Sequence, residues 1–227
     1  MEVIYRDALM LAINKPAGLP VHKGAGRKMA TLEDYLDDLR FGLPKRPELV
    51  HRLDKDTTGC LLLGRNKAAL KRLSELFLNH QIQKTYLAVV HGVITVHSGE
   101  INLPIAKKSA DKKSWWGKID KEGQQAFTQY TVLQRSATAT LVKLTPITGR
   151  THQLRIHMQA IGHPIVGDDI YGIKNEKQSL CLHCAEMEVP LYAKREKIVV
   201  KAELPENFSK TVEMMDLLKK LSNRRLR

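Results

Sequence analysis

The run from His51 to Gly59, His-Arg-Leu-Asp-Lys-Asp-Thr-Thr-Gly, is a short polar segment that directly precedes the apolar stretch Cys60 to Leu63. Within it, Asp54 is flanked by two permanent cations, Arg52 and Lys55. A positive local field favours the ionised carboxylate, which can then act as a nucleophile or as a general base. Asp54 is therefore the first candidate for a catalytic group.

Two more segments place reactive side-chain types beside expected secondary structure. Lys84-Thr-Tyr86 opens an expected strand. The segment from Gly149 to His157, Gly-Arg-Thr-His-Gln-Leu-Arg-Ile-His, leads into an expected helix, and Arg155 lies at the flank of its apolar stripe. A long side chain in that position can reach from buried surroundings into a pocket. These segments add a phenol and a guanidinium to the carboxylate of Asp54.

Several well-known catalytic patterns are absent from the sequence. It has no phosphate-cradling glycine loop, no glycine-rich dinucleotide turn and no serine nucleophile elbow. Cys181-Leu-His-Cys184 lacks the second cysteine pair that a structural zinc site normally needs, so a buried strand carrying small thiols is the favoured interpretation. We therefore expect chemistry by carboxylate, phenol and guanidinium groups, with no metal and no cofactor.

The elements that must hold these groups follow from apolar periodicity. Short apolar runs bounded by turn formers predict a hairpin, two further strands and an antiparallel pair. The expected strands are Val3–Tyr5, Leu9–Ile13, Cys60–Leu63, Thr85–Val90, Ala126–Leu133 and Thr138–Thr145. Helical spacing predicts helices over Leu32–Leu39, Ala69–Phe77 and Thr151–Ile161, and one after Pro205 that buries Met214, Met215, Leu218 and Leu221. Asp54 then lies on a loop that enters a strand.

Charge indicates a polyanionic partner. The 227 residues include 37 Lys and Arg against 24 Asp and Glu, a formal net charge of +13. Summed positive potential attracts phosphates, so nucleic acid is the simplest partner, and a basic protein without such a ligand is the alternative. Lys107 to Lys121 contains six lysines together with Trp115 and Trp116. This segment is expected either to contact RNA or to place a tryptophan at a core edge.

Length and cysteine content suggest a class and a compartment. The chain length fits one domain with a substantial core, and no stretch is long and apolar enough to cross a bilayer. Three cysteines are too few for a disulfide framework, and an odd number leaves one of them unpaired. We therefore expect a cytoplasmic protein with reduced thiols and no membrane partner.

The run from His51 to Gly59 resembles the signature of the RluA-type RNA pseudouridine synthases. Further matches occur in the family's order and cover about residues 3 to 205. They are Asn14-Lys-Pro-Ala-Gly18, Lys84-Thr-Tyr86, Thr148-Gly-Arg-Thr-His-Gln-Leu-Arg155, Gly162-His-Pro-Ile-Val-Gly-Asp168 and Leu182-His183. The resemblance implies an α+β fold with a largely antiparallel mixed β-sheet flanked by helices and loops. It also implies a monomer with a single catalytic domain over residues 1–227, without the S4-type RNA-binding domain that many members carry.

The resemblance implies isomerisation of uridine within structured RNA, with 23S rRNA favoured over tRNA. It identifies Asp54 as the catalytic carboxylate, with Arg155 as the ion-pair partner of that carboxylate and Tyr86 against the uracil face. Attack at C1′, attack on the ring and a glycal route all remain open. Substrate or RNA binding is expected from Arg52, Lys84, Arg150, His152 and Leu154. Arg52 is expected to fill the space left by a flipped nucleotide or to hold a phosphate.

Two other classes of function use the same residues. A non-catalytic RNA-binding or ribosome-assembly protein could keep the fold without turnover, although an intact Asp54 argues against it. A hydrolase acting on glycosidic bonds usually needs two cooperating carboxylates, and Asp56 is the near candidate for the second.

Overall fold

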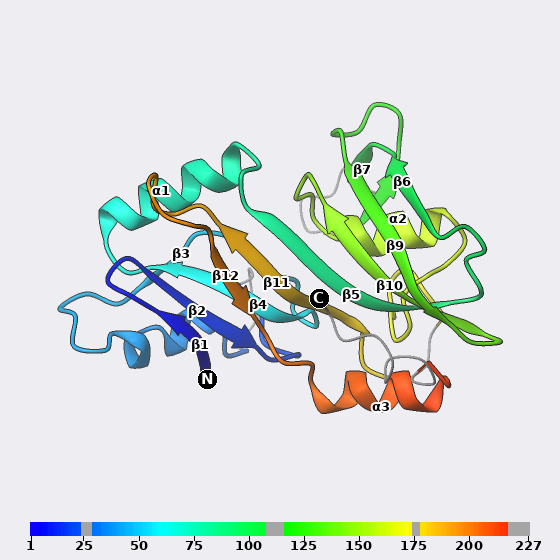
Figure 1. The fold of residues 1–227 in the computed structure, drawn as a ribbon, viewed down its shortest axis with the longest axis horizontal. Helices are drawn as coiled ribbons and strands as arrows, with labels where there is room; N and C mark the ends of the chain where they lie inside the picture. Colours follow the sequence, from blue (N-terminus) through cyan, green and yellow to red (C-terminus); the bar gives the residue numbers. More distant parts are fainter. Residues whose placement is uncertain (24–28, 108–115, 174–177, 218–227) are drawn as a thin grey trace. The chain divides into compact units, whose positions relative to one another are not determined.

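A computed structural model gives the positions of residues 1–23, 29–107, 116–173 and 178–217, which fall into two structural units (Figure 1). Unit 1 comprises Met1–Lys84 and Cys184–Glu203, and unit 2 comprises Thr85–His183 and Leu204–Arg227. The chain passes from one unit to the other within strand β5 (Gln83–His91), within strand β11 (Leu182–Val189) and after Glu203.

Unit 1 is built around strand β4 (Thr58–Gly64), every residue of which is buried. Strands β1 (Glu2–Arg6) and β2 (Met10–Lys15) form the predicted hairpin, and β2 pairs antiparallel with β4 so that Lys15 lies opposite Gly59. The short β3 (Glu48–Leu49) also pairs with β4, while β12 (Ile198–Lys201) pairs with β11. Because β4 is covered on both faces, its sequence is a continuous apolar run without alternation.

The predicted helix after β4 is present as α1 (Lys67–Leu78), which packs beside β4 (Figure 1). The side-chain oxygen of Asn66 caps its first turn by accepting from the Ala69 amide at 2.9 Å. Ala69, Leu73 and Leu76 are buried, as the apolar stripe predicted.

The helix predicted over residues 32–39 is wrong in type. The segment forms two 3₁₀ turns, η1 (Leu32–Tyr35) and η2 (Asp37–Leu39), and Tyr35 is 42% exposed. Aspartates compete for nearby backbone groups and favour caps over helix interiors. Here Asp34 accepts from the Thr31 amide at 2.9 Å, which favours a short capped turn over a continuous helix.

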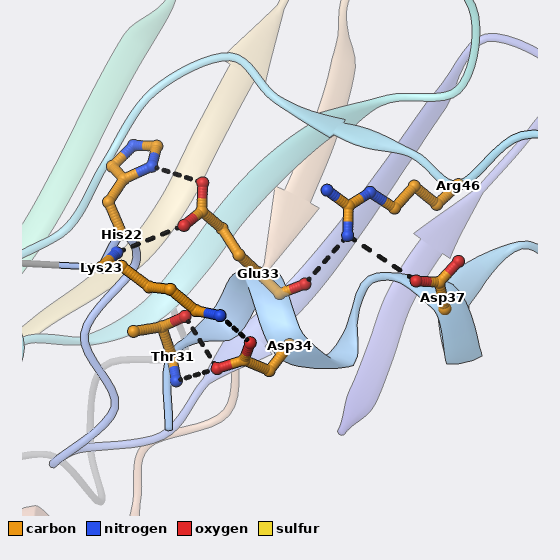
Figure 2. A network of polar contacts seen from close by, with 7 residues as sticks. All are labelled: His22, Lys23, Thr31, Glu33, Asp34, Asp37 and Arg46. Atoms are coloured by element: carbon orange, nitrogen blue, oxygen red, sulfur yellow. Dashed lines mark hydrogen bonds and ion pairs between the residues drawn. The ribbon is translucent and has the colours of Figure 1, made fainter. Parts of the chain in front are cut away.

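Polar contacts around this segment join its acidic side chains to Lys23, Arg46 and the imidazole of His22 from neighbouring loops (Figure 2). His22 Nδ1 lies 3.1 Å from Glu33, Lys23 Nζ lies 2.7 Å from Asp34, and Arg46 lies 3.6 Å from Asp37. These side chains are largely exposed, so solvent screens the pairs and they contribute little to stability. Burial of Leu32, Leu36 and Leu39 holds the segment against the rest of unit 1.

Unit 2 contains an antiparallel sheet in the order β5, β10 (Ala139–Pro146), β9 (Phe127–Arg135) and β6 (Ser98–Asn102) (Figure 1). The predicted antiparallel pair is thus confirmed as β9 and β10. A separate two-stranded sheet consists of β7 (Ile105–Lys107) and β8 (Gly117–Ile119). Together with the few helices, these sheets confirm the predicted α+β class with largely antiparallel strands.

Two helices complete the described part of unit 2. Helix α2 (Gln153–Ala160) confirms the helix predicted over residues 151–161, and its Ile156 packs in a buried cluster with Ile105 and Ala126. Helix α3 (Glu206–Met214) lies after Pro205 as predicted, but the stripe assigned to it is wrong at Met214, which is 79% exposed. Helix α3 instead buries Phe208, Thr211 and Val212, because it ends at Met214 and these residues share one face. The expected Leu218 and Leu221 lie outside the described residues.

All three cysteines are reduced and buried, as expected for Cys181 and Cys184. Burial raises the pKa of the Cys60 thiol to about 12, and it raises the pKa of Cys181 as well. Over residues 1–23, 29–107, 116–173 and 178–217, no helix has the length and apolar character needed to cross a membrane.

Candidate active site

Asp54 lies in unit 1 on the loop that leads into β4, as the sequence predicts. The Thr57 amide donates to the Asp54 carbonyl at 3.2 Å and closes a tight turn over residues 54–57. The Asp54 side chain is half-buried, whereas the flanking Arg52 and Lys55 are exposed. The loop therefore presents its cations to solvent and keeps its carboxylate partly shielded.

Lys15 holds the backbone of this loop, a role that the sequence did not reveal. It is fully buried, and its ammonium donates to the carbonyl oxygens of Pro16 at 2.7 Å, Leu19 at 2.9 Å and Lys55 at 2.8 Å. Burial lowers the pKa of Lys15 to about 8, while the charges of Asp56 and Asp54 act in the opposite direction. The backbone next to Asp54 is thus held by a hydrogen bond from a buried cation.

His51, at the start of the same run, is also a structural part of the loop. Its Nε2 accepts a hydrogen bond from the Leu62 amide at 2.8 Å, and its ring stacks on Phe77 with 4.5 Å between centroids. Burial lowers the pKa of His51 to about 3, and the charge of Lys84 acts in the same direction. The imidazole is therefore neutral and links the Asp54 loop to β4 and α1.

This arrangement predicts a loss of stability in acid. Above about pH 6.5 both the folded and unfolded states carry a neutral His51, but below it only the unfolded state takes up the proton. The free energy of unfolding should therefore fall by about 1.4 kcal/mol per pH unit on account of this residue as the pH drops from about 6.5 towards 3. Urea unfolding as a function of pH measures this slope.

A His51→Gln variant offers the comparison, because the glutamine oxygen can replace Nε2 as an acceptor but does not titrate. We expect it to show a shallower acid dependence than the wild-type chain. His80→Asn, a change at an exposed histidine, serves as the matched control and should leave the slope unchanged. Equal slopes for wild type and His51→Gln would contradict the assignment.

Tyr86 and Lys84 lie on β5, as predicted. Tyr86 is 9% exposed and stands opposite Leu144 of β10 in unit 2. Lys84 is half-buried in unit 1, where burial lowers its pKa. Because Tyr86 lies on a central strand, the sheet fixes its backbone and so sets the position of its phenol.

The loop before α2 is fastened to β9 by Gln153. Its side-chain oxygen accepts from the Thr148 hydroxyl at 2.7 Å and from the Arg150 amide at 3.0 Å. Its side-chain nitrogen donates to the Phe127 carbonyl at 3.0 Å and to the Thr128 hydroxyl at 2.9 Å. The amide group is thus used on both sides, which identifies Gln153 as the anchor of the loop. Arg150 is exposed and its Nε donates to the Gln125 carbonyl at 3.0 Å.

His152 adopts a left-handed backbone conformation with φ of 56°, which is uncommon for a non-glycine residue. Its Nδ1 lies 2.8 Å from the Tyr171 hydroxyl, and the two rings meet edge to face. The Gly117 amide donates to the same hydroxyl at 2.9 Å. Tyr171 therefore holds the His152 imidazole in a defined place at the start of α2.

Arg155, on α2, is 5% exposed and forms a two-pronged ion pair with Asp168. Its Nε donates to Asp168 Oδ2 and its Nη2 to Asp168 Oδ1, both at 2.7 Å. Burial alone would raise the pKa of Asp168. The hydrogen bonds and charge of Arg155, together with the amides of Tyr171 and Ile170, lower it by more, so the pKa is below its usual value. Leu154, the neighbouring candidate, is buried on the same helix.

The structure adds Lys15, His51, Asp168 and Tyr171 to the candidates that the sequence offered. Lys15 and Asp168 stood inside segments that matched the family, but nothing in their sequence context distinguished buried ions from solvated ones. Of the basic segment 107–121, Lys107 is exposed in β7 and Trp116 is 46% exposed. Trp115 and the lysines between it and β7 lie outside the described residues. In the part of the chain that the structure describes, no group of His, Cys, Asp and Glu could hold a metal ion.

Comparison with known proteins places these segments in a family. A family model described as RNA pseudouridylate synthase matches residues 9–160. A protein from Zymomonas mobilis named as an uncharacterized RNA pseudouridine synthase is 42% identical over 211 residues, which are 92% of this chain and 95% of the relative. Ribosomal large subunit pseudouridine synthase C from Haemophilus ducreyi is 40% identical over 75% of this chain, which spans about half of that relative (53%). The solved structure of human RNA pseudouridylate synthase domain containing 4 aligns with a TM-score of 0.80 at 29% identity, covering 95% of this chain and 93% of that one.

Proposed function

Because this chain belongs to the RNA pseudouridylate synthase family, we propose that it isomerises specific uridines in structured RNA, with the 23S rRNA of the large ribosomal subunit favoured over tRNA. The chain is an RNA pseudouridine synthase, an isomerase. One observation carries the proposal: the family match over residues 9–160 includes Asp54, Tyr86 and Arg155 together. The preference for ribosomal RNA rests on relatives named for the large ribosomal subunit.

The proposed reaction breaks the glycosidic bond between C1′ and N1 of a uridine, turns the uracil, and joins C5 to C1′. The proton on C5 is lost, and N1 gains one, so the product is an isomer of the substrate. A base inside a folded RNA must leave its stack for this to happen. Arg52 is exposed two residues before Asp54, and we propose that its side chain fills the space left by the flipped nucleotide or binds a phosphate.

Asp54 is proposed to supply the reacting carboxylate. Its backbone is fixed by the turn with Thr57 and by the Lys15 contact to Lys55, so the carboxylate needs little reorganisation to react. Tyr86 is proposed to lie against the uracil face, where a phenol can also take part in removing the C5 proton. Arg155 is proposed, from the family resemblance, to be the cation that keeps the reacting carboxylate ionised.

RNA binding is proposed for the other candidates. Arg150 and Lys107 are exposed cations that can contact phosphates, whereas His152 is held by Tyr171 and is better suited to brace the loop. Lys84 and Leu154 are proposed to shape the substrate site. The whole chain, residues 1–227, is proposed to act as one monomeric catalytic domain. Its buried reduced thiols support a cytoplasmic location.

Tritium release from RNA labelled at uridine C5 tests this proposal, because only isomerisation removes the C5 hydrogen. We expect release from a large-subunit rRNA transcript and much less from tRNA transcripts under the same conditions. Release from tRNA alone would correct the substrate, and free uracil would indicate hydrolysis. RNA binding without any release would overturn the enzymatic reaction in favour of a binding protein.

A further inference from the structure

Asp168 is a buried carboxylate that accepts four hydrogen bonds. Its side chain is 0% exposed, and besides the two bonds from Arg155 its Oδ1 accepts from the amides of Ile170 and Tyr171, each at 3.0 Å. The Gly172 amide donates to the Asp168 carbonyl at 3.1 Å. Hydrogen bonds therefore hold the carboxylate in place within a turn of residues 168–172.

Asp168 binds the guanidinium of Arg155 along the edge that carries Nε and Nη2. Asp168 takes Nε and Nη2, and a guanidinium carries more N–H donors than one carboxylate can use. The same turn supplies the Tyr171 ring, whose centroid lies 5.2 Å from Arg155 Cζ. Side-on pairing with a face contact fixes both the position and the plane of the guanidinium.

The backbone of Arg155 does not need Asp168 to hold it. Helix α2 is already anchored by the Gln153 contacts to β9 and by Ile156 in its buried cluster. Asp168 therefore acts on the side chain of Arg155, because its two bonds set the direction of a long side chain with several rotatable bonds. A buried ion pair also adds little stability over an apolar pair of similar volume, so stability alone does not account for it.

We propose that Asp168 is a positioning residue for catalysis, which orients the guanidinium of Arg155 for its part in the reaction. This inference rests on the proposed function, since it presumes that Arg155 takes part. The turn of residues 168–172 has a second effect through Tyr171, which holds His152 at the start of the same helix. One short turn thus fixes two side chains that the sequence placed in the site.

The test is a double-mutant cycle on tritium release, measured in single turnovers with enzyme in excess over labelled RNA. It compares wild type, Asp168→Asn, Arg155→Met and the double variant, each well below its own Tm. Asp168→Asn should slow the step at saturating enzyme by about 10- to 100-fold, as expected for a misplaced catalytic group, with the Kd for RNA within about twofold of wild type. In the Arg155→Met background the same change should have less than about a twofold effect, because its target is gone.

Asp169→Asn is the matched control. This neighbouring carboxylate lies 3.9 Å from Arg155 Nη2, but its side chain is 80% exposed, so the rate should stay within about twofold of wild type. If Asp168→Asn fails to fold, Asp168→Glu decides the question. It keeps the charge but moves the carboxylate by one methylene, and the rate should fall at least about fivefold with unchanged RNA affinity.

Two outcomes would overturn the inference alone while the proposed function stands. One is an active wild type in which the Asp168 and Arg155 effects multiply. The other is a folded Asp168→Asn or Asp168→Glu variant with the wild-type rate. A wild-type chain that releases no tritium from any RNA would overturn the proposed function and this inference with it.

Discussion

Asp54→Asn should reduce pseudouridine formation by at least ~10³-fold, because it removes the carboxylate proposed to react while keeping the size of the side chain. The fold should be kept, since the size of the side chain is unchanged and contacts from Lys15 and His51 hold the backbone of the loop. Single-turnover tritium release with labelled RNA measures the rate, and filter binding of the same RNA should give a Kd close to that of wild type.

Asp56→Asn is the control for this experiment. It lies two residues away in the same loop, is half-buried as Asp54 is, and removes the same charge next to Lys15. We expect it to retain activity within about tenfold of wild type, as for a residue that shapes the loop without reacting. A comparable loss in both variants would mean that the loop depends on total negative charge, and it would remove the special role of Asp54.

Gly59→Ala should strongly destabilise unit 1. Gly59 has φ of +107°, and a Cβ there would lie 2.2 Å from the carbonyl oxygen of Cys184. The carbonyl oxygen is a backbone atom of β11, so relief requires moving a strand rather than a side chain. We expect a loss of about 3–5 kcal/mol, a large part of the stability of an ordinary domain.

Gly18→Ala separates the two causes of that loss. Gly18 also has a positive φ, +79°, but a Cβ there would meet no atom within 4 Å. Its substitution should therefore destabilise by only about 1–2 kcal/mol, the strain of a left-handed alanine. Urea unfolding of both variants measures the difference, and equal losses would show that the approach to Cys184 is not limiting.

The sequence predicted those parts of the fold where local apolar patterns match local structure. The β1–β2 hairpin, β4, α1 and the β9–β10 pair follow from such patterns and are confirmed. The segment 32–39 has the apolar spacing of an α-helix only if Tyr35 is buried, whereas Tyr35 is 42% exposed. The stripe of α3 was misplaced because Met214 is apolar yet lies at the exposed end of the helix.

The candidate site shows the same limit. Asp54 could be identified because the charges of Arg52 and Lys55 adjoin it in sequence. Asp168 could not, because its bond to Arg155 joins residues that are distant along the chain, and a buried aspartate has the same sequence signature as a solvated one. Lys15 has a similar explanation: it ends β2 after Asn14, and a cation in such a position is rarely fully buried.

The buried cysteines give the molecule built-in reporters of local opening. Cys60 and Cys184 lie in unit 1 and Cys181 in unit 2, and each is shielded from solvent. An alkylating reagent needs an accessible thiolate, so in the native state modification must wait until the surrounding strands separate. Mapping the modified cysteines would then report when the strands around each thiol open, without any introduced label.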